Sequence, residues 1–173
     1  ASGGVGSLSV AMLAKLGYEV SAITGKQSER DFLLGLGASE VIMRNDFEEE
    51  NTRPMLKGDF AGGIDTVGGN ILANMIKSIQ PAGVVTCCGN AASDKLNLTV
   101  YPFILRGISL IGIDSQNCPM AHREAVWNKL ASDWKPAGLL DIYKEITLDE
   151  LSDHIDLMLD GKLKGRTIVD MDA

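Results

Sequence analysis

A glycine-rich turn at the start of the chain, ASGGVGS over residues 1–7, leads directly into a segment with the apolar spacing of a helix. Apolar side chains recur with that spacing as far as Leu16, and Gly17 ends the pattern. In α/β proteins a glycine turn at a helix N-terminus binds a diphosphate, because backbone N–H groups reach the phosphates where no Cβ intervenes. Gly6 would also allow the helix to pack closely on a neighbouring strand. The turn therefore favours an α/β fold that binds a dinucleotide.

Short β-rich segments alternate with helical ones along most of the chain. We expect strands at residues 18–23, 40–43, 63–68, 84–89 and 109–113, and helices at residues 8–16, 28–36, 70–79 and 120–130. Between them we expect Ser28 as the N-cap of the second helix, a loop or short helix at residues 45–59, a turn at residues 81–83 and a loop that carries Pro102. This alternation predicts a Rossmann-type, doubly wound parallel sheet.

In the doubly wound topology the strand that precedes the glycine turn is the first one, and it lies at the centre of the sheet. The sequence begins at the turn itself. We therefore expect a sheet that lacks its first strand, in a chain cut from a larger protein.

The pattern changes near residues 134–138, which read as a boundary. Beyond it we expect a strand at residues 145–148, a helix at residues 151–159 and a strand at residues 167–169. The sequence thus predicts a Rossmann domain, truncated at its N-terminus, at residues 1–138, and NADP is the dinucleotide that we expect it to bind. Residues 139–173 would form a β-α-β tail that packs on a domain outside this sequence.

The chain has 173 residues, of which 45% are hydrophobic, enough for one domain with a real core. Its formal net charge is −7, and the acidic residues are spread along the sequence, which argues against a nucleic-acid or anionic-membrane partner. No apolar run reaches membrane-spanning length. Cys87, Cys88 and Cys118 form no CxxC pair, so we expect reduced thiols in a cytoplasmic protein.

The first expected strand ends about 20 residues after the glycine turn, where the adenosine ribose of a dinucleotide would lie. NAD-binding proteins usually place Asp or Glu there, whereas this chain has Thr24, Gly25 and Lys26. A carboxylate would repel a 2′-phosphate, but a hydroxyl, a backbone N–H and an ammonium would hold it by charge-assisted hydrogen bonds. We therefore expect NADP(H) rather than NAD. For Lys26 and for the nearby Arg44, an ordinary solvated charge is the alternative interpretation.

Other polar residues have simpler structural interpretations. Asp65 lies in an expected strand and is better explained as a hydrogen-bonded structural carboxylate than as a catalytic base. Cys87 and Cys88 follow an apolar run and are most simply explained as core residues. His122 and His154 have no second ligand at metal spacing, so we expect no metal site. The glycines after the expected strands, Gly68, Gly69 and Gly89, mark either a ligand crevice or tight turns.

Seven segments together carry a resemblance to a known family: ASGGVGS, AKLGYEV, TGK, LGASEVI, GGIDTVGG, YPFILRGISLIGIDS and GKLKGRTIV. The chain resembles the medium-chain dehydrogenase/reductase superfamily over nearly its whole length. Within it, the chain is most similar to the zinc-independent quinone-oxidoreductase branch and its acrylyl-CoA reductase family. The resemblance implies a two-domain NADPH-dependent reductase, with a GroES-like catalytic domain before the Rossmann domain. The tail at residues 139–173 would pack on that catalytic domain. It also implies a homodimer in which the edge strand at residues 109–113 pairs with its mate.

The resemblance also implies which residues contact the cofactor. The phosphate loop would be Ser2, Gly3, Gly4 and Val5, and the 2′-phosphate pocket would be Thr24, Gly25 and Lys26, with Arg44 beside the adenine and ribose. Lys26 stands where many relatives have Arg, which keeps the charge but loses the planar fork. Asn90 stands where the family more often has Leu, so a backbone contact is expected. Ile104 and Ser115 match positions near the nicotinamide, and Gly161 matches a cofactor contact in the tail.

The implied chemistry is hydride transfer from NADPH to the β-carbon of an activated alkene such as acryloyl-CoA, with the developing enolate stabilised by hydrogen-bond donors. No residue stands out as the proton donor, and we expect this chain alone to be inactive. Two alternatives stay open: an NADPH:quinone oxidoreductase, and a non-catalytic NADP-binding sensor or interaction module. A short-chain dehydrogenase is disfavoured, because no tyrosine is followed four residues later by the lysine that such enzymes need.

Overall fold

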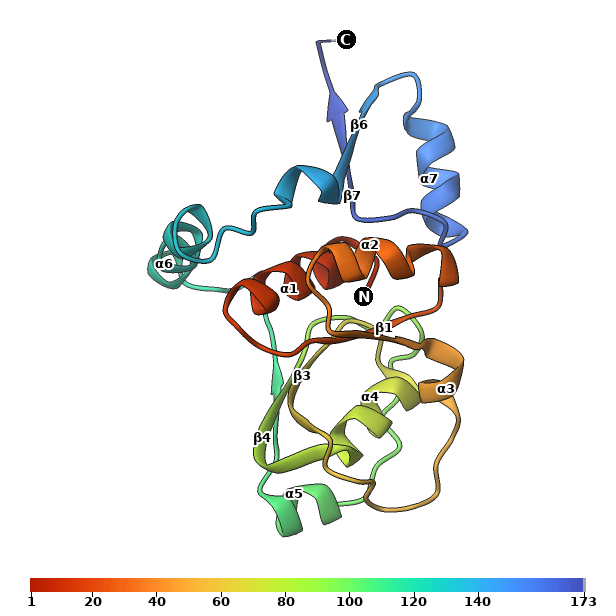
Figure 1. Cartoon of the computed structure of the whole chain (residues 1–173), viewed down its shortest axis with the longest axis vertical. Coiled ribbons are helices and arrows are strands. Elements are labelled where there is room, and N and C mark those ends of the chain that lie inside the picture. Colours follow the sequence, from red (N-terminus) through yellow and green to blue (C-terminus); the bar gives the residue numbers. More distant parts are fainter. Residues whose placement is uncertain (173) are drawn as a thin grey trace. The chain divides into compact units, whose positions relative to one another are not determined.

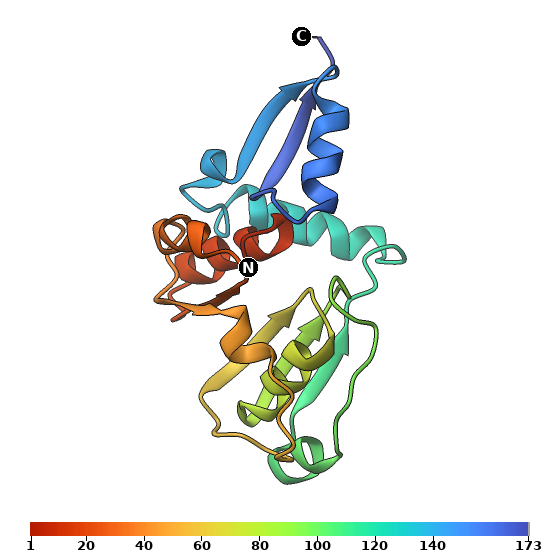
Figure 2. The ribbon, with the colours of Figure 1, turned by 90° about the vertical axis from the view of Figure 1, so that its right-hand side faces the viewer.

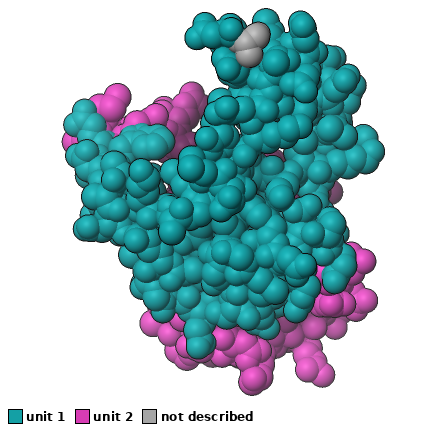
Figure 3. Space-filling view, turned by 45° about the horizontal axis from the view of Figure 1, so that its top comes forward, with its two compact units in different colours: residues 1–42, 124–173 teal, residues 43–123 magenta. Residues whose placement is uncertain are grey.

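The computed structural model of the chain describes residues 1–172 and divides them into two compact units. The first unit holds Ala1–Ile42 and the described residues from Glu124 onward, and the second holds Met43–Arg123. Figure 3 colours the two units separately. Each unit has its own hydrophobic core.

The first unit begins with the helix that the glycine turn predicts, α1 (Gly4–Lys15). The helix ends where Gly17 adopts a left-handed φ of +85°, and the Tyr18 N–H donates to the Leu13 carbonyl. The next elements are β1 (Ser21–Thr24), the 3-10 helix η1 (Gln27–Glu29), α2 (Arg30–Gly35) and β2 (Glu40–Met43). The strands β1 and β2 form one sheet, and α1, α2 and both strands contribute buried aliphatic side chains to one core.

The first unit also contains the tail of the chain. After α6 (Met120–Ala131), which crosses the boundary between the units, come η2 (Leu139–Ile142), β6 (Tyr143–Thr147), α7 (Leu151–Leu159) and β7 (Arg166–Asp170). The strands β6 and β7 pair in parallel, and α7 forms the crossover between them (Figures 1 and 2). The β-α-β order expected for the tail is confirmed. Ile142 of η2 packs in the same core as α1 and α2.

The second unit is a parallel sheet with helices. Its elements are α3 (Arg44–Glu48), β3 (Phe60–Asp65), α4 (Gly69–Lys77), β4 (Ile79–Cys87), α5 (Tyr101–Arg106) and β5 (Ser109–Gly112). The strands lie in the order β3-β4-β5, and both pairs are parallel. Leu72 and Ile76 of α4 pack with Val85 of β4 in the core. Val84 of β4 and Ile111 of β5 point to the opposite face of the sheet, and both are more than 40% exposed. Within this unit, therefore, only one face of the sheet is covered.

The described strands therefore fall into three sheets, β1-β2, β3-β4-β5 and β6-β7. The alternation of strands with helices and the parallel pairing in the last two sheets confirm the expected parallel α/β class. The central strand expected before residue 1, and the domain boundary expected at residue 138, stay predictions.

Four local expectations are corrected. Ser28 does not cap a helix: it lies within η1, its hydroxyl donates to the Glu29 carboxylate, and α2 begins only at Arg30. The strand expected to be buried at residues 63–68 is β3, which starts at Phe60 and of which only Asp65 is buried. A half-covered sheet explains why the other β3 residues keep contact with solvent.

The remaining two corrections concern prolines. The turn expected at residues 81–83 lies within the range of β4, where Ala82 has a φ of +61° and the register with β3 shifts, so it is an irregularity inside one strand rather than a turn between two elements. Pro102 lies in α5 and not in a loop. A proline in the first turn of a helix costs little, because the N–H that it lacks has no partner within the helix.

Candidate functional site

The front of α1 is a helix N-terminus that no described side chain caps. Its N-cap is Gly3, and its first turn holds no acidic residue. The first N–H groups of the helix therefore keep their partial positive charge and their need for an acceptor. A Cβ built on Gly3 would meet no atom within 4 Å, so a ligand can approach the backbone there. This geometry suits an anion.

The end of β1 is joined to this turn by buried hydroxyl groups. The Thr24 side chain is only 2% exposed, its Oγ1 lies 3.2 Å from Oγ of the buried Ser2, and it accepts a hydrogen bond from the Lys26 N–H at 3.2 Å. The hydroxyl of Thr24 is thus occupied inside the protein. Gly25 is exposed and Lys26 half-buried, so these two residues present the polar groups of this strand end to a ligand.

A further cation lies against the same turn. Arg166, the first residue of β7, places its side chain over Gly4, where a Cβ would collide with the guanidinium. The backbone supports this position, since the Gly165 N–H donates to the Ser2 carbonyl at 2.9 Å and Gly3 and Gly165 form a parallel bridge. Sequence reasoning missed Arg166. The only available signal was the basic run GKLKGR in an otherwise acidic chain.

Eight of the expected cofactor residues lie in the first unit: Ser2, Gly3, Gly4, Val5, Thr24, Gly25, Lys26 and Gly161. The structure brings the first seven together through the hydroxyl pair of Ser2 and Thr24. Gly161 follows α7 with a φ of +67°, and its N–H donates to the Met158 carbonyl. The tail runs from there past the N-terminus of the chain toward β7 (Figure 2).

The other four expected residues, Arg44, Asn90, Ile104 and Ser115, lie in the second unit. Asn90 and Ser115 are exposed, and each follows the carboxyl end of a strand, β4 and β5 respectively. Ile104 is different. It lies on α5, whose Arg106 donates to the Ile79 carbonyl at the amino end of β4. The structure therefore does not bring Ile104 together with Asn90 and Ser115.

A buried carboxylate organises the carboxyl end of the second unit's sheet. Asp65 is 1% exposed, its Oδ2 accepts the Gly68 N–H at 2.9 Å, and the Cys87 thiol approaches the same oxygen at 3.6 Å. This is the structural role expected for Asp65. Cys87 is half-buried and Cys88 is exposed, so the expectation of a core residue is wrong for Cys88. Partial loss of solvation raises the pKa of both thiols, and the charge of Asp65 raises it further. Both thiols are thus kept protonated, which disfavours a nucleophilic role.

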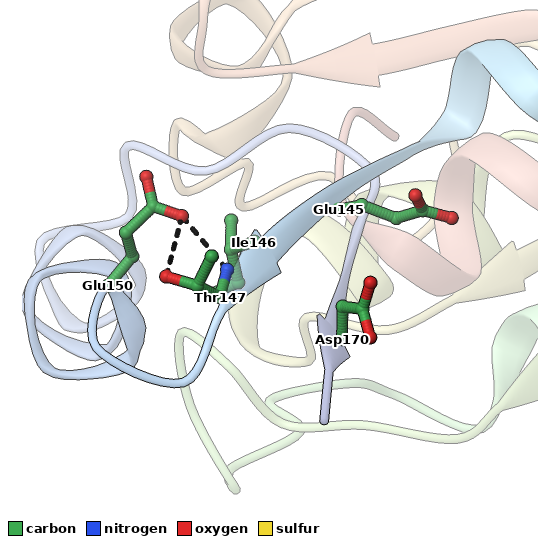
Figure 4. Close-up of a pocket in the computed structure, with 5 residues that line it drawn as sticks. All are labelled: Glu145, Ile146, Thr147, Glu150 and Asp170. Carbon is green, nitrogen blue, oxygen red and sulfur yellow. Dashed lines mark hydrogen bonds between the residues drawn. The ribbon is translucent and has the colours of Figure 1, made fainter. Parts of the chain in front are cut away.

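A small acidic pocket lies in the tail (Figure 4). Its volume is about 160 Å³, and its lining includes the carboxylates of Glu145, Glu150 and Asp170. The Thr147 N–H and hydroxyl donate to Glu150, and these bonds lower the pKa of that carboxyl. The negative charge makes this pocket unsuitable for phosphates. Among the described residues, no three His, Cys, Asp or Glu side chains are grouped as a metal site, and no helix is both long and apolar enough to cross a membrane.

The fold and the open helix N-terminus define a parallel α/β protein with a candidate anion site, and comparison with known proteins specifies the family. The family model described as "Zinc-binding dehydrogenase" matches residues 4–132. The chain therefore belongs to this family, and the resemblance to the medium-chain dehydrogenase/reductase superfamily is confirmed.

Two curated relatives match nearly the whole chain. "Putative quinone oxidoreductase YhfP" of Bacillus subtilis (strain 168) is 45% identical over 170 residues, which cover 98% of this chain and 52% of that protein. "Acrylyl-CoA reductase AcuI" of Ruegeria pomeroyi is 39% identical over 173 residues, which cover 100% of this chain and 52% of that protein. The chain spans about half the length of the curated relatives it matches.

Solved structures give the same fold. The structure of Escherichia coli K-12 YhdH with bound NADPH has a TM-score of 0.92 and 41% identity, over 97% of this chain and 51% of that one. The structure of Bacillus subtilis YhfP with NAD bound also has a TM-score of 0.92, with 44% identity over 97% of this chain and 51% of that one. Similar chains thus bind either dinucleotide.

Proposed function

We propose that this chain is the dinucleotide-binding half of an NADPH-dependent oxidoreductase, whose catalytic domain lies outside these 173 residues. The observation that carries the proposal is the front of α1, where no described side chain caps the helix and the side chain of Arg166 lies over Gly4. The NADPH bound to YhdH supports the choice of ligand.

The residues at this site fit the chemistry of NADP(H). A diphosphate carries two negative charges, and the amides of α1 together with Arg166 supply donors and a positive charge for them. The 2′-phosphate would lie at Gly25 and Lys26. The contacts proposed for Arg44, Asn90, Ile104, Ser115 and Gly161 rest on the family resemblance alone.

When bound, NADPH would supply the hydride that reduces an activated alkene such as acryloyl-CoA. The residues of this chain bind and orient it: the turn at residues 2–5 fixes the diphosphate, and Lys26 fixes the adenosine end, so that the nicotinamide has one position. The substrate pocket would lie between this domain and the catalytic domain, and no residue of this chain stands out as the proton donor. This chain alone should therefore bind NADPH and show no turnover.

Two other functions rest on specific observations. The relative named as a quinone oxidoreductase supports quinone as the electron acceptor. An NADP-binding sensor would need only the site described above. Turnover of a protein carrying both halves, assayed with NADPH and either acryloyl-CoA or a series of quinones, separates the three. Activity with neither acceptor class would favour the sensor.

Lys26 decides the preference between the two dinucleotides in this proposal. Because a hydrogen bond to a charged group contributes about 1.5–3 kcal/mol, Lys26→Met should weaken NADPH binding roughly tenfold or more and leave NADH binding nearly unchanged. Titration calorimetry with both cofactors measures this. Lys15→Met, which removes an exposed lysine from the far end of α1, is the matched control. An unchanged preference in Lys26→Met would show that Lys26 does not read the 2′-phosphate.

A further inference from the structure

The segment at residues 161–166, which joins α7 to β7 and includes the first residue of β7, is held against the candidate cofactor site at several points. Its Gly165 N–H donates to the Ser2 carbonyl, and its Leu163 carbonyl accepts a hydrogen bond from the Lys26 ammonium. The Lys164 ammonium lies 4.7 Å from the centroid of the Phe32 ring of α2. We call residues 161–166 the tail turn.

These contacts close a ring of hydrogen bonds. Starting from the tail turn, Gly165 bonds to the backbone of Ser2, the Ser2 hydroxyl pairs with Thr24 at 3.2 Å, Thr24 accepts the Lys26 N–H, and the Lys26 side chain returns to Leu163. Ser2 and Thr24 are both buried, so water competes little for the middle of this ring. The ring links the phosphate loop, the end of β1 and the tail turn.

We infer that the tail turn is a specificity element: it positions Lys26 for the 2′-phosphate, and so sets the preference for NADPH over NADH. The inference rests on the proposed dinucleotide site. A lysine ammonium has three N–H donors, and the Leu163 carbonyl takes one of them. Two donors remain for a phosphate, and the long side chain is already restricted to one region. Binding then loses less side-chain entropy than it would with a freely moving lysine.

The effect on selectivity can be separated from a general effect on binding. Arg166 lies beside the diphosphate position, and both dinucleotides have a diphosphate. A displaced tail turn therefore weakens the binding of NADPH and NADH alike through Arg166. Only NADPH carries the 2′-phosphate that Lys26 would contact. The ratio of the two dissociation constants therefore reports on the 2′-phosphate contacts proposed for Gly25 and Lys26, and the Lys26→Met background isolates the part that depends on Lys26.

Gly165→Ala displaces the tail turn. Gly165 has a φ of +61°, and a Cβ there would collide with the backbone carbonyl of Ile142, which cannot move aside as a side chain could. Gly17→Ala is the matched control in the same unit, since Gly17 also has a positive φ, but a Cβ on it meets nothing within 4 Å. Both variants carry backbone strain, and only one moves the tail turn.

The experiment measures the dissociation constants of NADPH and NADH for the full chain by titration calorimetry. The expected result is a fall in the NADPH preference by roughly three- to tenfold in Gly165→Ala, with the preference retained in Gly17→Ala. In a Lys26→Met background, Gly165→Ala should leave the remaining ratio unchanged, because the tail turn acts through Lys26. If Gly165→Ala does not fold, Thr24→Val breaks the same ring at its buried centre and should lower the preference in the same way.

An unchanged preference in a folded Gly165→Ala or Thr24→Val protein would overturn the inference and leave the proposed function standing. So would an equal loss of preference in the Lys26→Met background. If the unaltered chain binds neither dinucleotide, the proposed function fails, and this inference fails with it.

Discussion

Asp65 shows what one buried carboxylate does in this fold: it holds the Gly-Gly turn after β3 through the Gly68 N–H. Because a hydrogen bond to a charged group contributes about 1.5–3 kcal/mol, Asp65→Ala should lower the free energy of unfolding by about that amount. Urea denaturation measures the loss. Asp65→Asn keeps an acceptor oxygen and should lose less; equal losses in the two variants would show that the bond to Gly68 is not the stabilising contact.

For single residues, the sequence predicts the structural role where the chemistry of the side chain alone decides it. A carboxylate in an apolar strand must find donors, so the structural role of Asp65 could be predicted. The buried hydroxyl of Thr24 could not, since the sequence does not show that Ser2 and Lys26 occupy it. Arg166 was missed for a related reason: only the folded tail brings this residue from near one end of the chain to Gly4 at the other.

At the scale of single elements, Gly6 in the first turn of α1 is required for steric reasons. A Cβ there would lie 2.5 Å from the Ala1 carbonyl oxygen, which is backbone and cannot rotate away. Although alanine favours helices by about 1 kcal/mol over glycine, Gly6→Ala should destabilise the chain. Gly35→Ala in α2, where a Cβ meets nothing within 4 Å, should be neutral or stabilising. Thermal unfolding compares the two variants. A stabilised Gly6→Ala protein would contradict the close packing.

The connection from β6 to α7 should respond to pH through Glu150. The bonds from Thr147 lower the pKa of Glu150 in the folded chain, so ionised Glu150 stabilises the fold above its ordinary pKa and the stabilisation is lost as the pH falls. The wild type should therefore be more stable than Glu150→Gln at neutral pH, and the difference should shrink below about pH 4. Chemical denaturation at several pH values measures it. A difference that is constant over this range would contradict the role assigned to Thr147.

The apolar periodicity of the sequence predicts where most helices and strands lie, but not always the residues at which they begin and end. The ranges of β2 and α7 agree with the sequence, because glycines and polar residues bound clear apolar patterns. The loop predicted at Pro102 is wrong, because a proline is also compatible with the first turn of a helix, and Pro102 lies there in α5. The register shift near Ala82 within β4 depends on pairing with β3, a contact that a linear pattern does not contain.

At the scale of the whole molecule, the exposed edge of the second unit's sheet makes association testable. β5 lies at the edge of the sheet, and its Ile111 is 47% exposed. We expect a homodimer in which β5 pairs with its mate, because an apolar edge strand pairs readily. Light scattering should give twice the chain mass, and Ile111→Lys should reduce it to a monomer. Leu140→Lys, which alters an exposed apolar residue of the first unit, is the control. A well-folded wild-type monomer would contradict this expectation.

The most direct test of the central claim is a crystal structure of the chain with NADPH. The account predicts a diphosphate at the N-terminus of α1, bound by its first backbone N–H groups and by Arg166, with the 2′-phosphate within hydrogen-bond distance of Lys26. A dinucleotide bound elsewhere on the chain, or crystals grown with saturating NADPH that hold none at α1, would contradict it.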